Sequence, residues 1–90
     1  MRKKLDVNAL MKATAHRNYC RRIARHLIRT LMISPVLDLS LEFGLGRQHD
    51  NESVIAAWVG KRVPVGEAGN VQELRAELRG LLEQICEESS

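Results

Sequence analysis

Apolar residues recur every three or four positions over the first third of the chain. The series consists of Val7, Leu10, Met11, Cys20, Ile23, Ala24, Leu27, Ile28 and Leu31. This spacing is typical of one face of an α-helix and predicts helical structure over residues 6–33, behind a basic tail at residues 1–5. Asp6 is placed to cap the first turn. Asn18 leaves open whether the segment is one helix or a short helix followed by a longer one.

Residues 34–46 carry two conflicting patterns. Ser34 followed by Pro35 is typical of a helix start, and Gly44 is suited to end such a helix. However, apolar and polar residues alternate strictly from 37 to 43, which is the period of a short strand. We favour a helix, because no second segment of similar alternation follows that could pair with a strand.

A polar loop at residues 46–52 separates this segment from the next apolar one. Asp50 or Asn51 can cap a short helix that runs through Val59. Gly60 is placed to end that helix, because glycine readily adopts the left-handed conformation of a helix C-terminus.

The last helix is predicted over residues 70–87. Asn70 and Glu73 form a capping box at its start. A narrow seam of leucine and isoleucine then follows at helical spacing: Leu74, Leu78, Leu81 and Ile85. Two heptads are too few for a free-standing coiled coil, so the seam can dock on the core of its own chain or on a second copy. We expect a homodimer in which these four residues form part of the interface.

The composition agrees with a small helical protein. Only 3% of the 90 residues are aromatic, so the core must be built from aliphatic side chains, which favours packed helices over a β-sandwich. We therefore expect one all-α domain over residues 1–90, with four to five helices. The longest apolar run has six residues, which is far below the roughly 20 that cross a membrane. With only two cysteines and no signal-peptide pattern, we expect a cytoplasmic protein.

The charge is unevenly distributed along the chain. Residues 1–30 hold nine Lys/Arg and one acid, or +8, whereas residues 31–90 hold five Lys/Arg and ten acids, or −5. Four of the cations recur every fourth residue and form one row on the predicted first helix, here called the arginine ridge: Arg17, Arg21, Arg25 and Arg29. Arg22 and His26 flank it. Such asymmetry indicates either an external anionic partner or neutralisation by the downstream acids.

The sequence contains no recognised catalytic or cofactor-binding motif. It lacks a glycine-rich phosphate loop, a nucleophile elbow and a paired set of catalytic carboxylates. His16 and Cys20 lie four residues apart, but two ligands do not make a metal site. We therefore expect a protein that is not an enzyme and that holds neither a metal nor another cofactor.

Two short stretches resemble a known DNA-binding family. The first stretch is carried by Leu39, Ser40, Phe43 and Gly44, and the second by Trp58, Lys61, Arg62 and Pro64. Together they are similar to the helix-turn-helix domain of the lambda-repressor and Cro type, in which a positioning helix precedes a recognition helix. The resemblance implies a helix-turn-helix within residues 34–64. The stretch between the two helices is longer here than in that family.

The resemblance implies a small transcriptional regulator of phage or bacterial type that binds double-stranded DNA. Short polar side chains at the start of a recognition helix can reach base edges, and the residues so placed are Arg47, Gln48, Asn51 and Ser53. The residues expected to contact phosphates are Lys61, Arg62, Arg22 and the arginine ridge. The alternative is a helical adaptor or inhibitor that docks the ridge on an acidic protein surface.

Overall fold

A computed structural model describes residues 7–45 and 49–89 of the chain. The predicted basic tail, the proposed cap Asp6, and the predicted base contacts Arg47 and Gln48 lie outside these residues.

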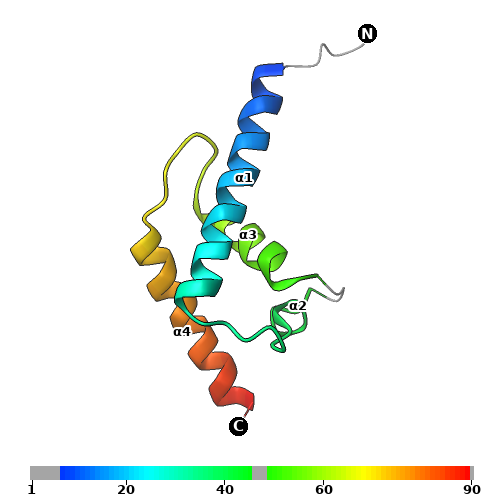
Figure 1. The fold of residues 1–90 in the computed structure, drawn as a ribbon, viewed down its shortest axis with the longest axis vertical. Helices are drawn as coiled ribbons and strands as arrows, with labels where there is room; N and C mark the ends of the chain where they lie inside the picture. The colour runs from blue at the N-terminus through cyan, green and yellow to red at the C-terminus, as the bar shows by residue number, and fades with distance from the viewer. Residues whose placement is uncertain (1–6, 46–48, 90) are drawn as a thin grey trace.

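Four helices make up the described part of the chain, and no strand occurs there. They are α1 (Val7–Thr30), α2 (Leu39–Glu42), α3 (Asn51–Arg62) and α4 (Val71–Ser89). Figure 1 shows α1 along the long axis of the molecule, with α3 packed against its second half and the start of α1 extending beyond the other helices. The predicted all-α class is therefore confirmed.

The core lies where the second half of α1 meets α3 and α4. Cys20, Ala24 and Leu27 supply the face of α1, and Ala24 and Leu27 are completely buried. The other helices contribute aliphatic side chains and one tryptophan: Leu39, Val54, Ile55, Trp58, Val59, Leu74 and Leu78. The apolar series over residues 20–31 therefore predicted the core face of α1 correctly, because residues that recur at the period of the helix lie on one side of it.

Helix α1 is continuous, so the sequence alternative with a break at Asn18 is wrong. The helix ends in a Schellman motif, in which the Ile33 amide donates to the Ile28 carbonyl oxygen at 3.0 Å and Met32 donates to Arg29. Met32 occupies the left-handed position of this motif, with φ of 53°, where glycine is usual.

The segment that follows α1 differs from its prediction at one end. Ser34 and Pro35 do not start a helix, since the helical turn α2 begins only at Leu39. Asp38 is the N-cap, and its Oδ1 accepts from the Leu41 amide at 3.1 Å. The predicted end at Gly44 is confirmed by its φ of 69°. The strand alternative for residues 37–43 is wrong, because this segment forms a helical turn.

Helix α3 begins as predicted but ends later. Asp50 caps it by accepting from the Ser53 amide at 2.7 Å. Gly60 lies inside the helix and does not end it, so Lys61 and Arg62 form its last turn. The end is set by Pro64, because a proline disfavours helical backbone in the residue before it, and Val63 is indeed extended at φ −113° and ψ 110°.

Helix α4 begins at its predicted cap. The Asn70 Oδ1 accepts from the amides of Gln72 and Glu73 at 3.1 and 3.3 Å. Just before it, the Gly69 amide donates to the Tyr19 hydroxyl oxygen at 2.8 Å, which ties the start of α4 to α1.

The leucine seam of α4 packs on its own chain. Leu74 and Leu78 belong to the core, Ile85 is buried, and Leu81 is half-buried against the core. Of the two uses predicted for the seam, docking on the core accounts for Leu74, Leu78 and Leu81. The predicted dimer interface at these residues would have to compete with that packing.

Candidate nucleic-acid interface

The arginine ridge lies on the solvent-facing side of α1. All four of its residues and the flanking Arg22 are exposed. A helix rises about 1.5 Å per residue, so the ridge from Arg17 to Arg29 is about 18 Å long. The ridge thus presents a row of guanidinium groups with a length comparable to several phosphates of a nucleic-acid backbone.

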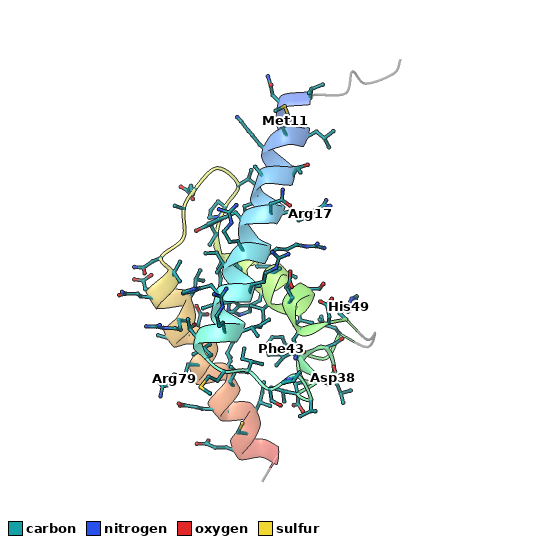
Figure 2. All side chains as sticks on the ribbon, in the orientation of Figure 1. Met11, Arg17, Asp38, Phe43, His49 and Arg79 are labelled. Atoms are coloured by element: carbon teal, nitrogen blue, oxygen red, sulfur yellow. The ribbon has the colours of Figure 1, made fainter. Side chains whose placement is uncertain are left out.

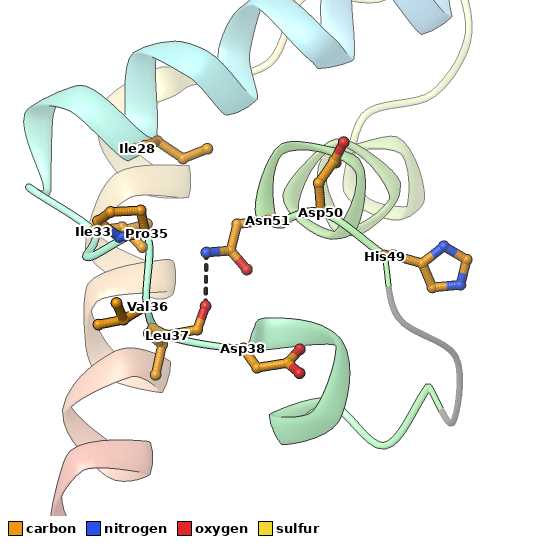
Figure 3. A pocket seen from close by; sticks show the side chains of 9 residues that line it. All are labelled: Ile28, Ile33, Pro35, Val36, Leu37, Asp38, His49, Asp50 and Asn51. Carbon is orange, nitrogen blue, oxygen red and sulfur yellow. Dashed lines mark hydrogen bonds between the residues drawn. The ribbon is translucent and has the colours of Figure 1, made fainter.

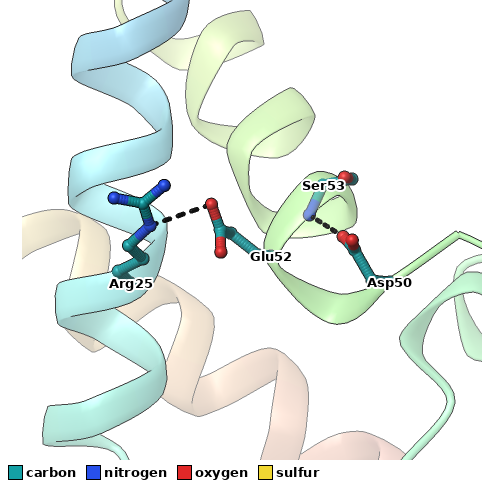
Figure 4. Close-up of polar contacts among 4 residues, drawn as sticks. All are labelled: Arg25, Asp50, Glu52 and Ser53. Atoms are coloured by element: carbon teal, nitrogen blue, oxygen red, sulfur yellow. Dashed lines mark hydrogen bonds and ion pairs between the residues drawn. The ribbon is translucent and has the colours of Figure 1, made fainter.

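The acidic residues that the structure describes neutralise little of the ridge. Arg25 Nε lies 3.0 Å from Glu52 Oε1 (Figure 4). Within the described residues, Arg17, Arg21 and Arg29 form no ion pair. Two of the α4 carboxylates pair instead with cations outside α1, because Glu77 binds Arg62 and Glu83 binds Arg79.

The start of α3 lies beside the ridge. Hydrogen bonds from the Ser53 side chain and amide hold the pKa of the Asp50 carboxyl below its ordinary value, and the nearby Arg21 lowers it further. Arg25 reaches Glu52 in the first turn of α3, as Figure 4 shows. The ridge and the N-terminus of α3 therefore form one surface, which carries two carboxylates among its guanidinium groups.

A shallow groove of about 340 Å³ runs between α1 and α3 on this surface. Arg17 and Arg21 line one wall, and Ser53, Ala56 and Ala57 line the other. In Figure 2, Arg17 extends from the side of α1 on which α3 lies, whereas Arg79 is found on α4 at the opposite side. The alanines make one wall small and apolar, so the arginines supply most of the hydrogen-bond donors.

Two of the predicted base contacts, Asn51 and Ser53, lie in different surroundings. Asn51 Nδ2 donates to the Leu37 carbonyl oxygen at 2.8 Å, as Figure 3 shows, and its Oδ1 accepts from the Leu39 amide at 3.2 Å. Both polar atoms of the Asn51 side chain, Nδ2 and Oδ1, therefore bind the backbone of the segment that leads into α2. Asn51 is a structural tether between α3 and α2, and its side chain would have to leave these partners to read a base. Ser53, in contrast, lies beside the groove.

The two cations at the end of α3 are not equivalent to the ridge. Arg62 lies over the Trp58 ring, with its Cζ 4.1 Å from the ring centroid, and Nη2 is 2.8 Å from Glu77 Oε1. These contacts turn Arg62 toward α4, away from the ridge. Lys61 is exposed in the last turn of α3. The structure thus separates Arg62 from the other predicted phosphate contacts.

The connection between α2 and α3 is longer than a helix-turn-helix requires. Eight residues, 43–50, separate the two helices, whereas the motif joins its helices by a turn of about three or four residues. Helix α2 itself has only four residues. The implied helix-turn-helix within residues 34–64 therefore stays a prediction.

The ion-pair partner of the ridge was not found from the sequence, whereas His16 and Cys20 were noted there as a pair four residues apart. Glu52, the partner of Arg25, is 27 positions away in the chain, and no local pattern marks such a pair. His16 Nε2 lies 2.6 Å from the Val63 carbonyl oxygen at the end of α3 and 3.7 Å from Cys20 Sγ. Burial raises the pKa of the Cys20 thiol, which keeps it protonated as a core residue. Within the described residues, no group of three or more metal-ligating side chains comes together.

No protein-family model, curated protein or solved structure matches this chain. Among the helices of the described ranges, none has an apolar stretch sufficient to cross a lipid bilayer.

Proposed function

We propose that this protein is a small DNA-binding regulator that holds double-stranded DNA through the arginine ridge of α1. The proposal rests on how exposed the ridge is and how little of its charge is neutralised, although ten acidic residues follow in residues 31–90. All four ridge residues are exposed, and of these only Arg25 forms an ion pair within the described residues. Like charges four residues apart are unfavourable in an isolated helix, so a row of them is best accounted for by an anionic partner.

The ridge supports contacts to phosphates rather than to bases. Arginine binds phosphate oxygens through paired N–H groups, and such contacts position a protein without specifying sequence. Readout of bases in this region would fall on Ser53, because Asn51 is bound to the α2 segment. Asp50 and Glu52 repel phosphates close to the helix start. We therefore expect modest sequence selectivity.

Fluorescence anisotropy with a labelled mixed-sequence duplex tests the proposal. A double variant, Arg17→Gln and Arg21→Gln, removes two charges from the ridge at exposed positions. Its matched control, Arg75→Gln and Arg79→Gln, removes two charges from exposed positions of α4. We expect binding at micromolar protein for the wild type and for the control, and a loss of about tenfold or more for the ridge variant. Equal weakening of both variants would contradict the proposal, since binding would then follow net charge alone.

A helical adaptor for an acidic protein surface is the second candidate. It is favoured by the exposed apolar residues Val7, Leu10 and Met11 on the same helix as the ridge. A protein partner would bury such residues, whereas a DNA backbone would not. Failure of the wild type to bind any duplex at micromolar concentration and low salt would favour this candidate.

A further inference from the structure

Arg25 and Glu52 form an ion pair on the face of the molecule that carries the arginine ridge. Arg25 belongs to the ridge, and Glu52 lies in the first turn of α3. Arg25 Nε lies 3.0 Å from Glu52 Oε1, and the two side chains are 62% and 33% exposed. Figure 4 shows them pointing toward each other between α1 and α3. An ion pair this exposed adds little to the stability of a fold, so a role in binding is open to it.

Both members of the pair keep hydrogen-bonding atoms for a partner. The bond between them uses Arg25 Nε and Glu52 Oε1. Among residues 7–45 and 49–89, Arg25 Nη1, Arg25 Nη2 and Glu52 Oε2 make no further hydrogen bond. The pair therefore presents a fork of two donor groups, with an acceptor oxygen held next to it.

A carboxylate on a face that binds DNA needs a particular partner. An ionised carboxylate only accepts hydrogen bonds, whereas phosphate oxygens are themselves acceptors and carry negative charge. Helices read bases in the major groove, where the donors on the base edges are the amino groups at cytosine N4 and adenine N6. Within the major groove, Glu52 can therefore contact DNA favourably only where one of these amino groups lies.

A G·C pair matches the donor fork and the acceptor oxygen together. Guanine presents two acceptors, O6 and N7, which the paired N–H groups of one arginine bind at once, and the cytosine opposite presents its N4 amino group as a donor. An A·T pair offers no two adjacent acceptors, because the adenine N6 donor lies between adenine N7 and thymine O4. The other carboxylate nearby does not compete, since Asp50 accepts from the Ser53 amide of its own helix.

We infer that the Arg25–Glu52 pair reads a G·C base pair in the major groove, an inference that rests on the proposed binding of duplex DNA. Arg25 Nη1 and Nη2 donate to guanine O6 and N7, and Glu52 Oε2 accepts from cytosine N4. The ion pair keeps the Arg25 fork in orientation, because Nε stays bound to Glu52 Oε1. Arg17 and Arg21, further along the ridge, remain on the phosphates.

Fluorescence anisotropy with two labelled duplexes at one salt concentration tests the inference. One duplex alternates inosine and cytosine, and the other alternates adenine and thymine. Inosine lacks the N2 amino group of guanine, so both duplexes present only acceptors in the minor groove, while the inosine–cytosine pairs keep the major-groove pattern of G·C. We expect the wild type to bind the inosine–cytosine duplex about tenfold more tightly than the adenine–thymine duplex.

Two variants assign the preference to the pair. Glu52→Ala should remove most of it without weakening binding to the adenine–thymine duplex, because a negative charge leaves the phosphate-binding face. Arg25→Lys keeps the charge at an exposed position but loses the fork, so it should also lose the preference. The control, Glu83→Ala, removes a carboxylate and its ion pair with Arg79 from α4 and should keep the wild-type preference.

The contrary outcomes are distinct from one another. Equal binding of the two duplexes by the wild type would overturn the inference and leave the proposed function in place, whereas binding of neither duplex would overturn both. A preference that survives Glu52→Ala would also overturn the inference. The same holds for a Glu52→Ala variant that loses affinity for both duplexes in equal proportion, because the pair would then act only by holding α3 against α1.

Discussion

The two faces of α1 have the same helical spacing but different surroundings. On the inner face, Cys20, Ala24 and Leu27 are buried against α3 and α4. On the outer face, the arginine ridge is exposed, and within the part of the chain that the structure describes it forms a single ion pair, between Arg25 and Glu52. Apolar side chains of α3 and α4 cover the inner face. Two of the α4 carboxylates, Glu77 and Glu83, pair with Arg62 and Arg79 and not with the ridge. The comparison separates residues that hold the fold from residues that are available to a partner.

The largest effect is expected on the inner face. Leu27 is completely buried, so Leu27→Ala removes apolar contacts and leaves a cavity. The free energy of unfolding should fall by about 2–5 kcal/mol. Arg29→Gln, two residues further on the outer face, should change it by no more than about 0.5 kcal/mol. Denaturant titration followed by circular dichroism measures both, and similar values for the two variants would remove the distinction between the faces.

The attachment of α4 beneath the inner face depends on Gly69. A Cβ at this position would lie 2.6 Å from Val63 Cγ2, which belongs to a stiff side chain, and 3.3 Å from Leu74 Cδ1. Gly69→Ala should therefore lower the free energy of unfolding by about 1–3 kcal/mol.

Gly80 provides the control for this substitution. Nothing lies within 4 Å of a Cβ built at this mid-helix position of α4. Gly80→Ala should raise the free energy of unfolding by about 0.5–1 kcal/mol, because alanine is the better helix former. If both variants were destabilised, Gly80 would have to be packed against something outside this chain.

The junction between the ridge and α3 depends on Asp50. Asp50→Ala removes the cap of α3 and should cost about 0.5–2 kcal/mol, whereas Asp50→Asn should keep most of it. Because folding lowers the pKa of Asp50, the unfolded chain binds its proton more tightly. The stabilisation is therefore present above the ordinary aspartate pKa and is lost as the pH falls through the lower folded value.

The pH dependence is measured by thermal unfolding between pH 6 and pH 2, which spans the range of aspartate titration at about 3.9. The melting temperature of the wild type should fall more steeply below that value than the melting temperature of Asp50→Asn. Parallel curves would show that the ionised carboxylate adds nothing to the cap.

The features that the sequence predicted correctly depend on neighbouring residues. The caps at Asp50 and Asn70 and the end of α2 at Gly44 each follow from a side chain and the backbone within a few positions of it. The buried positions of α1 follow from helical spacing. Where local signals compete, the sequence was misleading, since Pro64 and not Gly60 ends α3, and Asp38 and not Ser34 starts α2.

The candidate site was predicted less completely because it depends on contacts between distant segments. The row of arginines is visible in the sequence. That Asn51 binds the backbone at Leu37 and Leu39, and that Arg62 turns toward Glu77, follows only from the packing of the helices. Polar residues that are plausible for DNA contact in the sequence are thus partly used to hold the fold.

The salt dependence of DNA binding tests the central claim most directly. Each phosphate that the ridge neutralises releases condensed counterions, so log affinity should fall with log salt by about 0.9 per contact. The variant with Arg17→Gln and Arg21→Gln should therefore have a slope that is flatter than the wild-type slope by roughly one to two units. The α4 control with Arg75→Gln and Arg79→Gln should keep the wild-type slope. An unchanged slope in the ridge variant would contradict the account.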